Sequence, residues 1–151
     1  MLTTLLVGCL MVMGNMLIQI AAVVILVQIL LRKYNSGGFE FTIASDVRII
    51  SMVLLVLFIG HILQFATWAL LFVGIGEFGD FETAFYFSAV NFTSLGYGDI
   101  VMSEDYRLLG ALEAANGVMM FGLSASTILA VMNRLFSRHV GVARLKKSVE
   151  P

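Results

Sequence analysis

The chain has 151 residues, of which 60% are hydrophobic and 13% are charged, whereas soluble proteins average about 45–50% and about 25%. This composition excludes a soluble globular domain and an intrinsically disordered chain, and it is typical of a membrane protein. Nine Lys and Arg residues against ten Asp and Glu residues give a net charge of -1, so no overall basic field exists to bind nucleic acid.

The first predicted element is a transmembrane helix over residues 1–31. No charged residue occurs between Met1 and Leu31, and about 20 apolar residues suffice to cross the hydrocarbon core of a bilayer. The helix contains no series of arginines, so a voltage-sensing role is not expected. A loop over residues 32–48 follows.

Two further long apolar runs flank a shorter one. The uncharged run from Ile49 to Gly76 predicts a helix over 49–76, and the run from Leu108 to Asn133, interrupted only by Glu113, places another within 106–135. Between them lies an apolar and aromatic segment that is too short to cross a bilayer, so we expect a re-entrant helix over 80–93. Asp80 is its expected N-cap. The predicted fold is therefore an all-α membrane protein with three transmembrane helices and a re-entrant helix per chain, followed by a basic tail over 136–151.

Basic residues are concentrated in two segments that a three-span topology places on one side. Eight of the nine lie there: Arg32, Lys33, Arg48, Arg134, Arg138, Arg144, Lys146 and Lys147. The positive-inside rule then places the N-terminus outside and the C-terminus in the cytoplasm, in the plasma membrane or the bacterial inner membrane. Residues 77–107 are expected outside, where their acidic side chains would attract cations.

A glycine-rich motif follows the re-entrant segment, with the sequence Ser94-Leu95-Gly96-Tyr97-Gly98-Asp99. Rings of backbone carbonyls can replace the water shell of a cation inside a membrane. Consecutive carbonyls point to one axis only if alternate residues take left-handed or other unusual backbone conformations, which glycine adopts readily. The motif therefore indicates a cation-binding pore loop over residues 94–98.

This motif and the segment before it resemble the filter and pore helix of the potassium-channel superfamily, with Ser94 and Leu95 in place of the usual Thr and Val. The resemblance extends over residues 49–135, which correspond to the two-transmembrane pore module, and the first helix lies outside it. It implies K⁺ bound by the carbonyls of Ser94, Leu95, Gly96 and Tyr97, with Gly98 completing the filter. It also implies that the side chains of Leu95 and Tyr97 point backwards into packing. Four copies would surround one axis as a C4 homotetramer.

The resemblance also implies residues that support the filter. Thr93 ends the pore helix and Asp99 lies at the outer mouth, while Tyr86, Phe87 and Phe92 would form an aromatic cuff around Tyr97. Val90 replaces a carboxylate that many family members carry behind the filter. Glu113, an ionisable group inside a span, is a functional candidate. It could back the filter from the inner helix with Asn116 as a local partner, line the permeation path, or reach water at the helix end.

The inner helix carries the candidate cavity and gate. Gly117 matches the hinge glycine of the family, and a hinge role and a packing role are equally favoured. Helical spacing directs one set of residues toward the cavity: Val118, Phe121, Ala125 and Leu129. A competing stripe contains Glu113, Gly117, Met120, Ser124 and Thr127. His61, in the middle of the second span, is expected to be an uncharged histidine packed between helices rather than a pH sensor.

The predicted function is passive conduction of potassium ions through a homotetrameric pore in lipid. The alternatives are a poorly selective cation channel and a non-conducting regulatory or assembly subunit. An enzyme is not expected, because the sequence shows no nucleophile–base pair and no metal cluster. No cofactor is expected apart from the permeant K⁺ ions.

Overall fold

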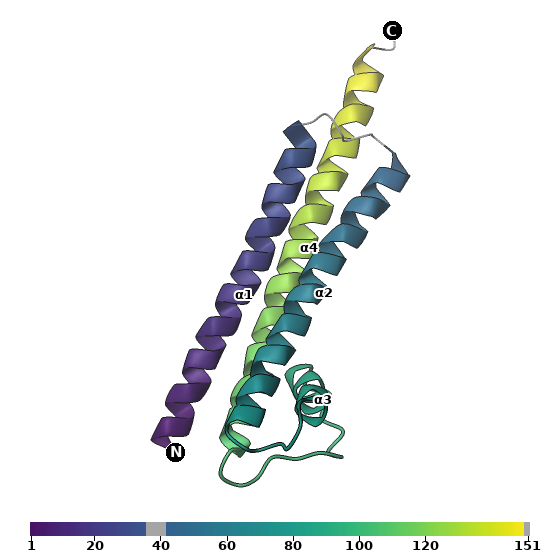
Figure 1. The fold of residues 1–151 in the computed structure, drawn as a ribbon. Coiled ribbons are helices and arrows are strands. Elements are labelled where there is room, and N and C mark those ends of the chain that lie inside the picture. Colours follow the sequence, from purple (N-terminus) through teal and green to yellow (C-terminus); the bar gives the residue numbers. More distant parts are fainter. Residues whose placement is uncertain (36–41, 150–151) are drawn as a thin grey trace.

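The computed structural model describes residues 1–35 and 42–149, without the side chains of Tyr34, Arg138 and residues 142–149. The described residues form four helices, which are α1 (Leu2–Asn35), α2 (Ile43–Gly74), α3 (Phe81–Phe92) and α4 (Arg107–Val149). The long helices α1, α2 and α4 form a bundle, and the short helix α3 lies at the end of the bundle that carries the N-terminus (Figure 1). This end also carries the loops on both sides of α3.

Three helices are long and apolar enough to cross a membrane, over Leu2–Lys33, Ile43–Gly74 and Arg107–Gly141. The twelve residues of α3 are too few to do so. The predicted fold class, three transmembrane helices with one short helix between the second and third, is therefore confirmed.

The largest differences between the predicted and the observed helix boundaries lie at three places. α1 continues four residues past Leu31. α2 begins at Ile43 because Thr42 caps it, its Oγ1 accepting a hydrogen bond of 3.3 Å from the amide of Ser45. α4 continues to Val149 through most of the predicted tail, where no proline interrupts it before residue 151. Of the predicted loop 32–48, residues 36–41 lie outside the described part of the chain.

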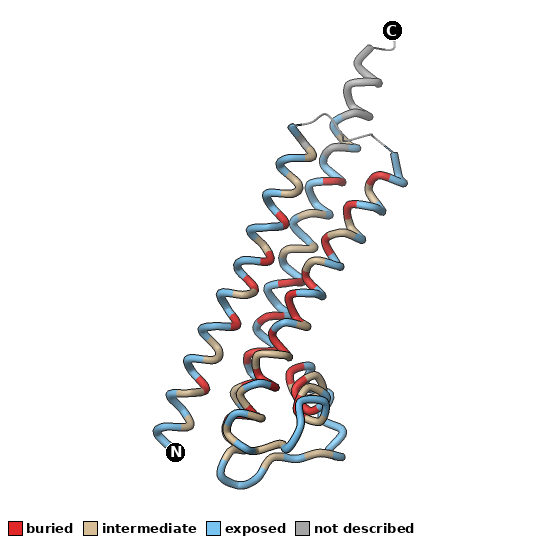
Figure 2. Tube along the Cα trace, in the orientation of Figure 1, coloured by how far each residue is buried: buried red, intermediate tan, exposed pale blue. Residues whose placement is uncertain are grey.

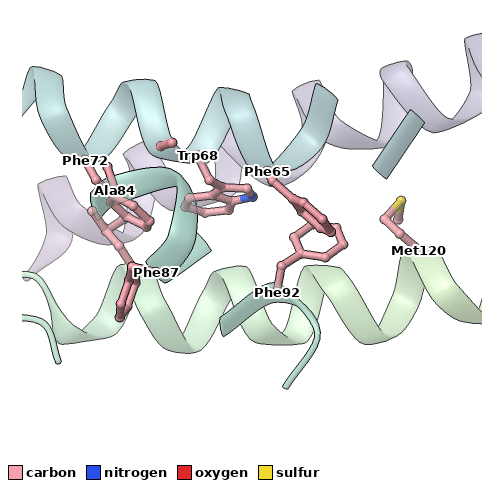
Figure 3. Packing of buried hydrophobic residues seen from close by; sticks show 9 residues of the cluster. Phe65, Trp68, Phe72, Ala84, Phe87, Phe92 and Met120 are labelled. Carbon is pink, nitrogen blue, oxygen red and sulfur yellow. The ribbon is translucent and has the colours of Figure 1, made fainter. Parts of the chain in front are cut away.

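Buried residues lie along the faces where the helices meet, and exposed residues cover the outside of the bundle (Figure 2). An aromatic cluster fills the contact between α3 and its neighbours, and Figure 3 shows Phe92 of α3 lying against Phe65 of α2. The cluster comprises Phe65, Trp68, Ala69, Phe72, Ala84, Phe87, Phe92, Leu109 and Met120. Because large aromatic side chains bury much apolar surface, this cluster fixes α3 against α2 and α4.

Contacts also hold the two ends of the bundle. At the α3 end, the carboxylate of Glu77 accepts hydrogen bonds from the amide (2.5 Å) and the hydroxyl (2.7 Å) of Ser103. At the opposite end, Nε2 of His139 on α4 lies 2.5 Å from Oδ2 of Asp46 on α2. The loop between α3 and α4 is thus attached to the end of α2, and α4 is attached to its beginning.

Candidate functional site

The short helix α3 has a defined start and end. Asp80 accepts hydrogen bonds of 2.8 Å from the amide and from the hydroxyl of Thr83, which confirms it as the N-cap. These bonds hold the pKa of Asp80 below its usual value. Thr93 forms the C-cap, and its hydroxyl donates to the carbonyl oxygen of Ala89 at 2.8 Å. The two caps therefore fix where α3 ends and where the motif begins, at residue 94.

The backbone after α3 alternates in conformation. Ser94, Gly96 and Gly98 have φ angles of 56°, 57° and 76°, and Ser94 is the only described residue other than glycine with a positive φ. The amides of Leu95 and Gly96 both approach the carbonyl oxygen of Val90, at 3.0 and 3.4 Å. Alternate left-handed residues are the backbone condition stated above for a row of carbonyls facing one axis. The two glycines were expected to adopt this conformation, whereas Ser94 was not.

The side chains around the motif are arranged differently from the prediction. Leu95 and Tyr97 are 55% and 66% exposed within the chain, instead of packed behind the motif. Phe87 packs against Phe72, with ring centroids 5.6 Å apart, and Phe92 packs against Phe65 at 5.1 Å. Phe87 and Phe92 therefore pack among the helices of their own chain, and a cuff around the Tyr97 of a neighbouring copy stays a prediction.

Tyr86 and Asp99 meet beside the motif. The Tyr86 hydroxyl donates a hydrogen bond of 2.7 Å to Oδ2 of Asp99. This bond lowers the pKa of the Asp99 carboxyl and raises the pKa of Tyr86. The first residue after Gly98 is thus connected to α3, and Asp99 carries a negative charge at neutral pH.

Glu113 lies in the contact between α3 and α4, with no exposed surface. Its Oε1 is 2.5 Å from the hydroxyl oxygen of Ser88, and its Oε2 accepts from Nδ2 of Asn91 at 2.7 Å. Ser88 also lies 3.0 Å from the carbonyl oxygen of Phe65 on α2. Glu113 therefore contacts α3 through Ser88 and Asn91, and the alternative of a carboxylate reaching water at the helix end is wrong.

Asn116, which was expected to be the partner of Glu113, does not bond it. Asn116 is buried, and neither atom of its side-chain amide has a hydrogen-bond partner among the described residues. The two residues that do bond Glu113 come from a different helix. Ser88 and Asn91 are three positions apart in α3, and this spacing on one helical face was the sequence signal that could have identified them.

Comparison with known proteins gives one match. Residues 51–134, more than half of the chain, match a family model described as an ion channel. The chain belongs to this ion-channel family. Its pore module is of the two-transmembrane type of the potassium-channel superfamily, and α1 is an additional N-terminal helix. Searches of curated proteins and of solved structures returned no match. With three apolar helices, the channel is a multi-pass membrane protein.

Within the channel, α3 and α4 approach each other closely at Gly117. A Cβ atom built at this position would lie 1.8 Å from the carbonyl oxygen of Phe92, so no side chain fits there without moving α3. Gly122, in contrast, has no atom of the chain within 4 Å of such a Cβ. The structure thus gives Gly117 a packing role at the end of α3.

The two stripes of α4 have different surroundings. Four residues of the competing stripe, Glu113, Gly117, Met120 and Ser124, are buried within the chain, and Thr127 is half-buried. The stripe predicted to face the cavity is exposed, and it consists of Val118, Phe121, Ala125 and Leu129. Of the two stripes, the predicted one is therefore the one that lies on the surface of the chain.

Proposed function

We propose that the protein conducts potassium ions passively through a tetrameric pore formed by residues 94–98 of four copies. The observation that carries the proposal is the alternation of left-handed residues at Ser94, Gly96 and Gly98, directly after the re-entrant helix α3. This backbone supports successive carbonyl rings, which can replace the hydration shell of a potassium ion. In this proposal the carbonyls of Ser94, Leu95, Gly96 and Tyr97 are the ion ligands.

The surfaces that a single chain leaves exposed support assembly around one axis. Residues 93–99 are exposed, and lipid cannot satisfy the backbone polar groups of such a loop. Leu95, Tyr97 and the stripe that includes Val118 and Phe121 are also exposed large apolar side chains. Association of four copies would cover these surfaces and surround the carbonyls with protein.

The charge distribution supports an orientation for this pore. Asp99, Glu104 and Asp105 belong to the loop between α3 and α4, at the α3 end of the bundle (Figure 1). Arg32 and Lys33 lie in the last turn of α1, and Arg134 lies in the second half of α4, toward the opposite end. The positive-inside rule places the basic end in the cytoplasm of a plasma membrane or bacterial inner membrane. The acidic end then faces outward, where it would raise the local concentration of cations.

Reversal potentials of the purified protein in liposomes, under opposing potassium and sodium gradients, test this proposal. We expect a reversal potential close to the potassium equilibrium potential. A value near zero would instead identify a poorly selective cation channel, and the absence of current would identify a non-conducting subunit.

Two glycine variants test the assignment of the filter. Gly96→Ala should abolish potassium flux while leaving tetramers intact, because a Cβ strains a residue with a φ of 57°. Gly76→Ala is the matched control, since Gly76 has a φ of 77° but lies in the loop before α3. Potassium selectivity that survives Gly96→Ala would contradict the carbonyl rings.

A further inference from the structure

We propose that the additional helix α1 positions the inner helix α4 through a hydrogen bond from Gln19 to Ser124, and thereby sets the balance between conducting and non-conducting states. The proposal rests on conduction by the pore module, and it assigns a role to the helix that lies outside residues 51–134. Gln19 is a positioning residue here, because it acts through Ser124 and not on the ion.

The face of α1 that contacts the other helices is polar in its middle. Its buried residues follow helical spacing, and they are Gly8, Asn15, Gln19, Ala22 and Leu26. Asn15 and Gln19 are 1% and 0% exposed, whereas leucines such as Leu10 and Leu17 point outward. Since lipid tails are as apolar as leucine, an apolar face gives helices little reason to associate, and hydrogen bonds between helices acquire more weight.

Gln19 uses both ends of its amide to join two helices. Its Oε1 accepts a hydrogen bond of 2.7 Å from Nε2 of Gln64 on α2, and its Nε2 donates one of 2.9 Å to Oγ of Ser124 on α4. Nε2 of His61 on α2 lies 3.0 Å from the same Ser124 oxygen. All four side chains are buried. They form one node, and we call Gln19, His61, Gln64 and Ser124 the polar node.

Other contacts hold α1 at this position along the bundle. Oδ1 of Asn15 accepts a hydrogen bond of 3.1 Å from the hydroxyl of Thr67 on α2. A Cβ at Gly60 would lie 3.4 Å from Cβ of Ala22, and one at Gly8 would lie 2.3 Å from Cδ1 of Leu112. Small residues therefore let α1 approach both α2 and α4 closely, in the way that membrane helices pack.

The polar node makes the position of α4 depend on α1. Ser124 lies about two helical turns beyond Gly117, which contacts the end of α3. Because Gln19 also accepts a bond from α2, a slide or rotation of α4 against α2 must break the Gln19–Ser124 bond or shift α1 with it. Apolar contacts alone would allow small slides without losing a directed bond. The node thus favours one arrangement of α4 over others.

Single-channel recordings of the full chain in planar bilayers test the proposal. Gln19→Leu and Ser124→Ala should each change the ratio of open to closed channels by about threefold, and both should change it in the same direction. A threefold change corresponds to about 0.6 kcal/mol, which is typical of one hydrogen bond between membrane helices. The single-channel conductance and the reversal potential should not change. Ser124→Thr, which keeps the hydroxyl, should behave like the parent.

Two variants serve as matched controls. Gln28→Leu makes the same change at an exposed position of α1. Ser126→Ala removes from α4 a hydroxyl whose hydrogen bond among the described residues goes to the carbonyl of Gly122 in its own helix, at 2.9 Å. Neither variant should change the open probability.

The double variant Gln19→Leu with Ser124→Ala should change the open probability by less than the two single effects combined, because both changes remove the Gln19–Ser124 bond. If Gln19→Leu fails to assemble in size-exclusion chromatography, Gln19→Met takes its place, because it keeps the length of the side chain and removes the amide that bonds Ser124. A conducting parent whose variants keep its open probability would overturn the role of α1, as would equal effects from the controls. A parent without current would instead overturn the conduction proposal and this one with it.

Discussion

Ser94 combines a left-handed backbone with a side chain that tolerates it. A residue with a Cβ adopts this conformation at a cost of about 1–2 kcal/mol, and β-branched residues such as threonine adopt it least readily. The superfamily that this motif resembles usually has threonine here, whereas this chain has Ser94 with a φ of 56°. The neighbouring amides of Leu95 and Gly96, both directed at the carbonyl of Val90, help to offset the strain. The serine is therefore compatible with the observed backbone.

The Tyr86–Asp99 hydrogen bond predicts a pH dependence of conduction. The bond lowers the pKa of Asp99. The stabilisation that the ionised Asp99 contributes is therefore present above the usual pKa of an aspartate, and it is lost as the pH falls through the lowered pKa of Asp99. Tyr86→Phe removes the bond, and the pKa of Asp99 should rise toward its usual value. Conductance at low salt, measured against outer pH, should then decline at a higher pH than in the parent.

Tyr106→Phe is the control for this measurement, because it removes a tyrosine hydroxyl from the same outer region without touching Asp99. Identical pH profiles for Tyr86→Phe and the parent would show that Asp99 does not influence the entry of ions.

Glu113 predicts a difference between two substitutions. Glu113→Ala leaves the Ser88 hydroxyl and the Asn91 amide short of a partner in a buried contact and opens a cavity, so stability should fall by roughly 2–4 kcal/mol. Glu113→Gln keeps the shape, and its amide can bond both groups, so most of that stability should remain. Thermal unfolding in detergent measures the difference, with Glu104→Ala at an exposed position as the control. Equal melting temperatures for Glu113→Ala and the parent would remove Glu113 from the support of the filter.

At the scale of elements, the number and type of helices could be predicted, while their mutual contacts could not. Length and hydropathy suffice for three spans, and Asp80 marks the start of α3. The helix ends were harder to predict. Thr42 caps α2 well before the apolar run starts at Ile49, and charged residues do not end α4. Contacts such as Glu113 with Ser88 depend on the rotation of each helix about its axis. Helices that are apolar all round give no periodic signal for that rotation.

The contact between α3 and α4 predicts that no residue larger than glycine is tolerated at position 117. Gly117→Ala places a Cβ 1.8 Å from the carbonyl oxygen of Phe92, so α3 must shift, which typically costs about 1–3 kcal/mol. We expect lower thermal stability and a loss of ion selectivity, since Ser94 is two residues beyond Phe92. Gly141→Ala, with no atom within 4 Å, is the control on the same helix. A stable and selective Gly117→Ala protein with altered gating would indicate a hinge instead of a packing role.

At the scale of the whole molecule, the three spans place the two ends of the chain on opposite sides of a membrane. α1 starts at the α3 end of the bundle, and α4 ends at the other (Figure 1). This relative arrangement follows from an odd number of spans, which hydropathy could predict. The direction relative to the cytoplasm depends on the eight basic residues discussed above.

Cysteine labelling measures that direction. In a Cys9→Ser background, a cysteine at Thr3 should react with a membrane-impermeant reagent added outside intact cells, and a cysteine at Ser148 only after the cells are opened. Labelling of both positions from the same side would contradict three spans, and exchange of the two results would reverse the orientation.

The exposed loop over residues 93–99 also has a consequence for how the protein is made. A newly inserted chain would present this loop to acyl chains, where each amide or carbonyl without a partner costs several kcal/mol. In the proposed tetramer, this loop gains protein surroundings only when other newly synthesised chains arrive. Assembly is then a condition for completing membrane insertion. A chain that stays alone exposes a segment that the assembled channel covers, and quality-control proteases of the membrane can recognise it.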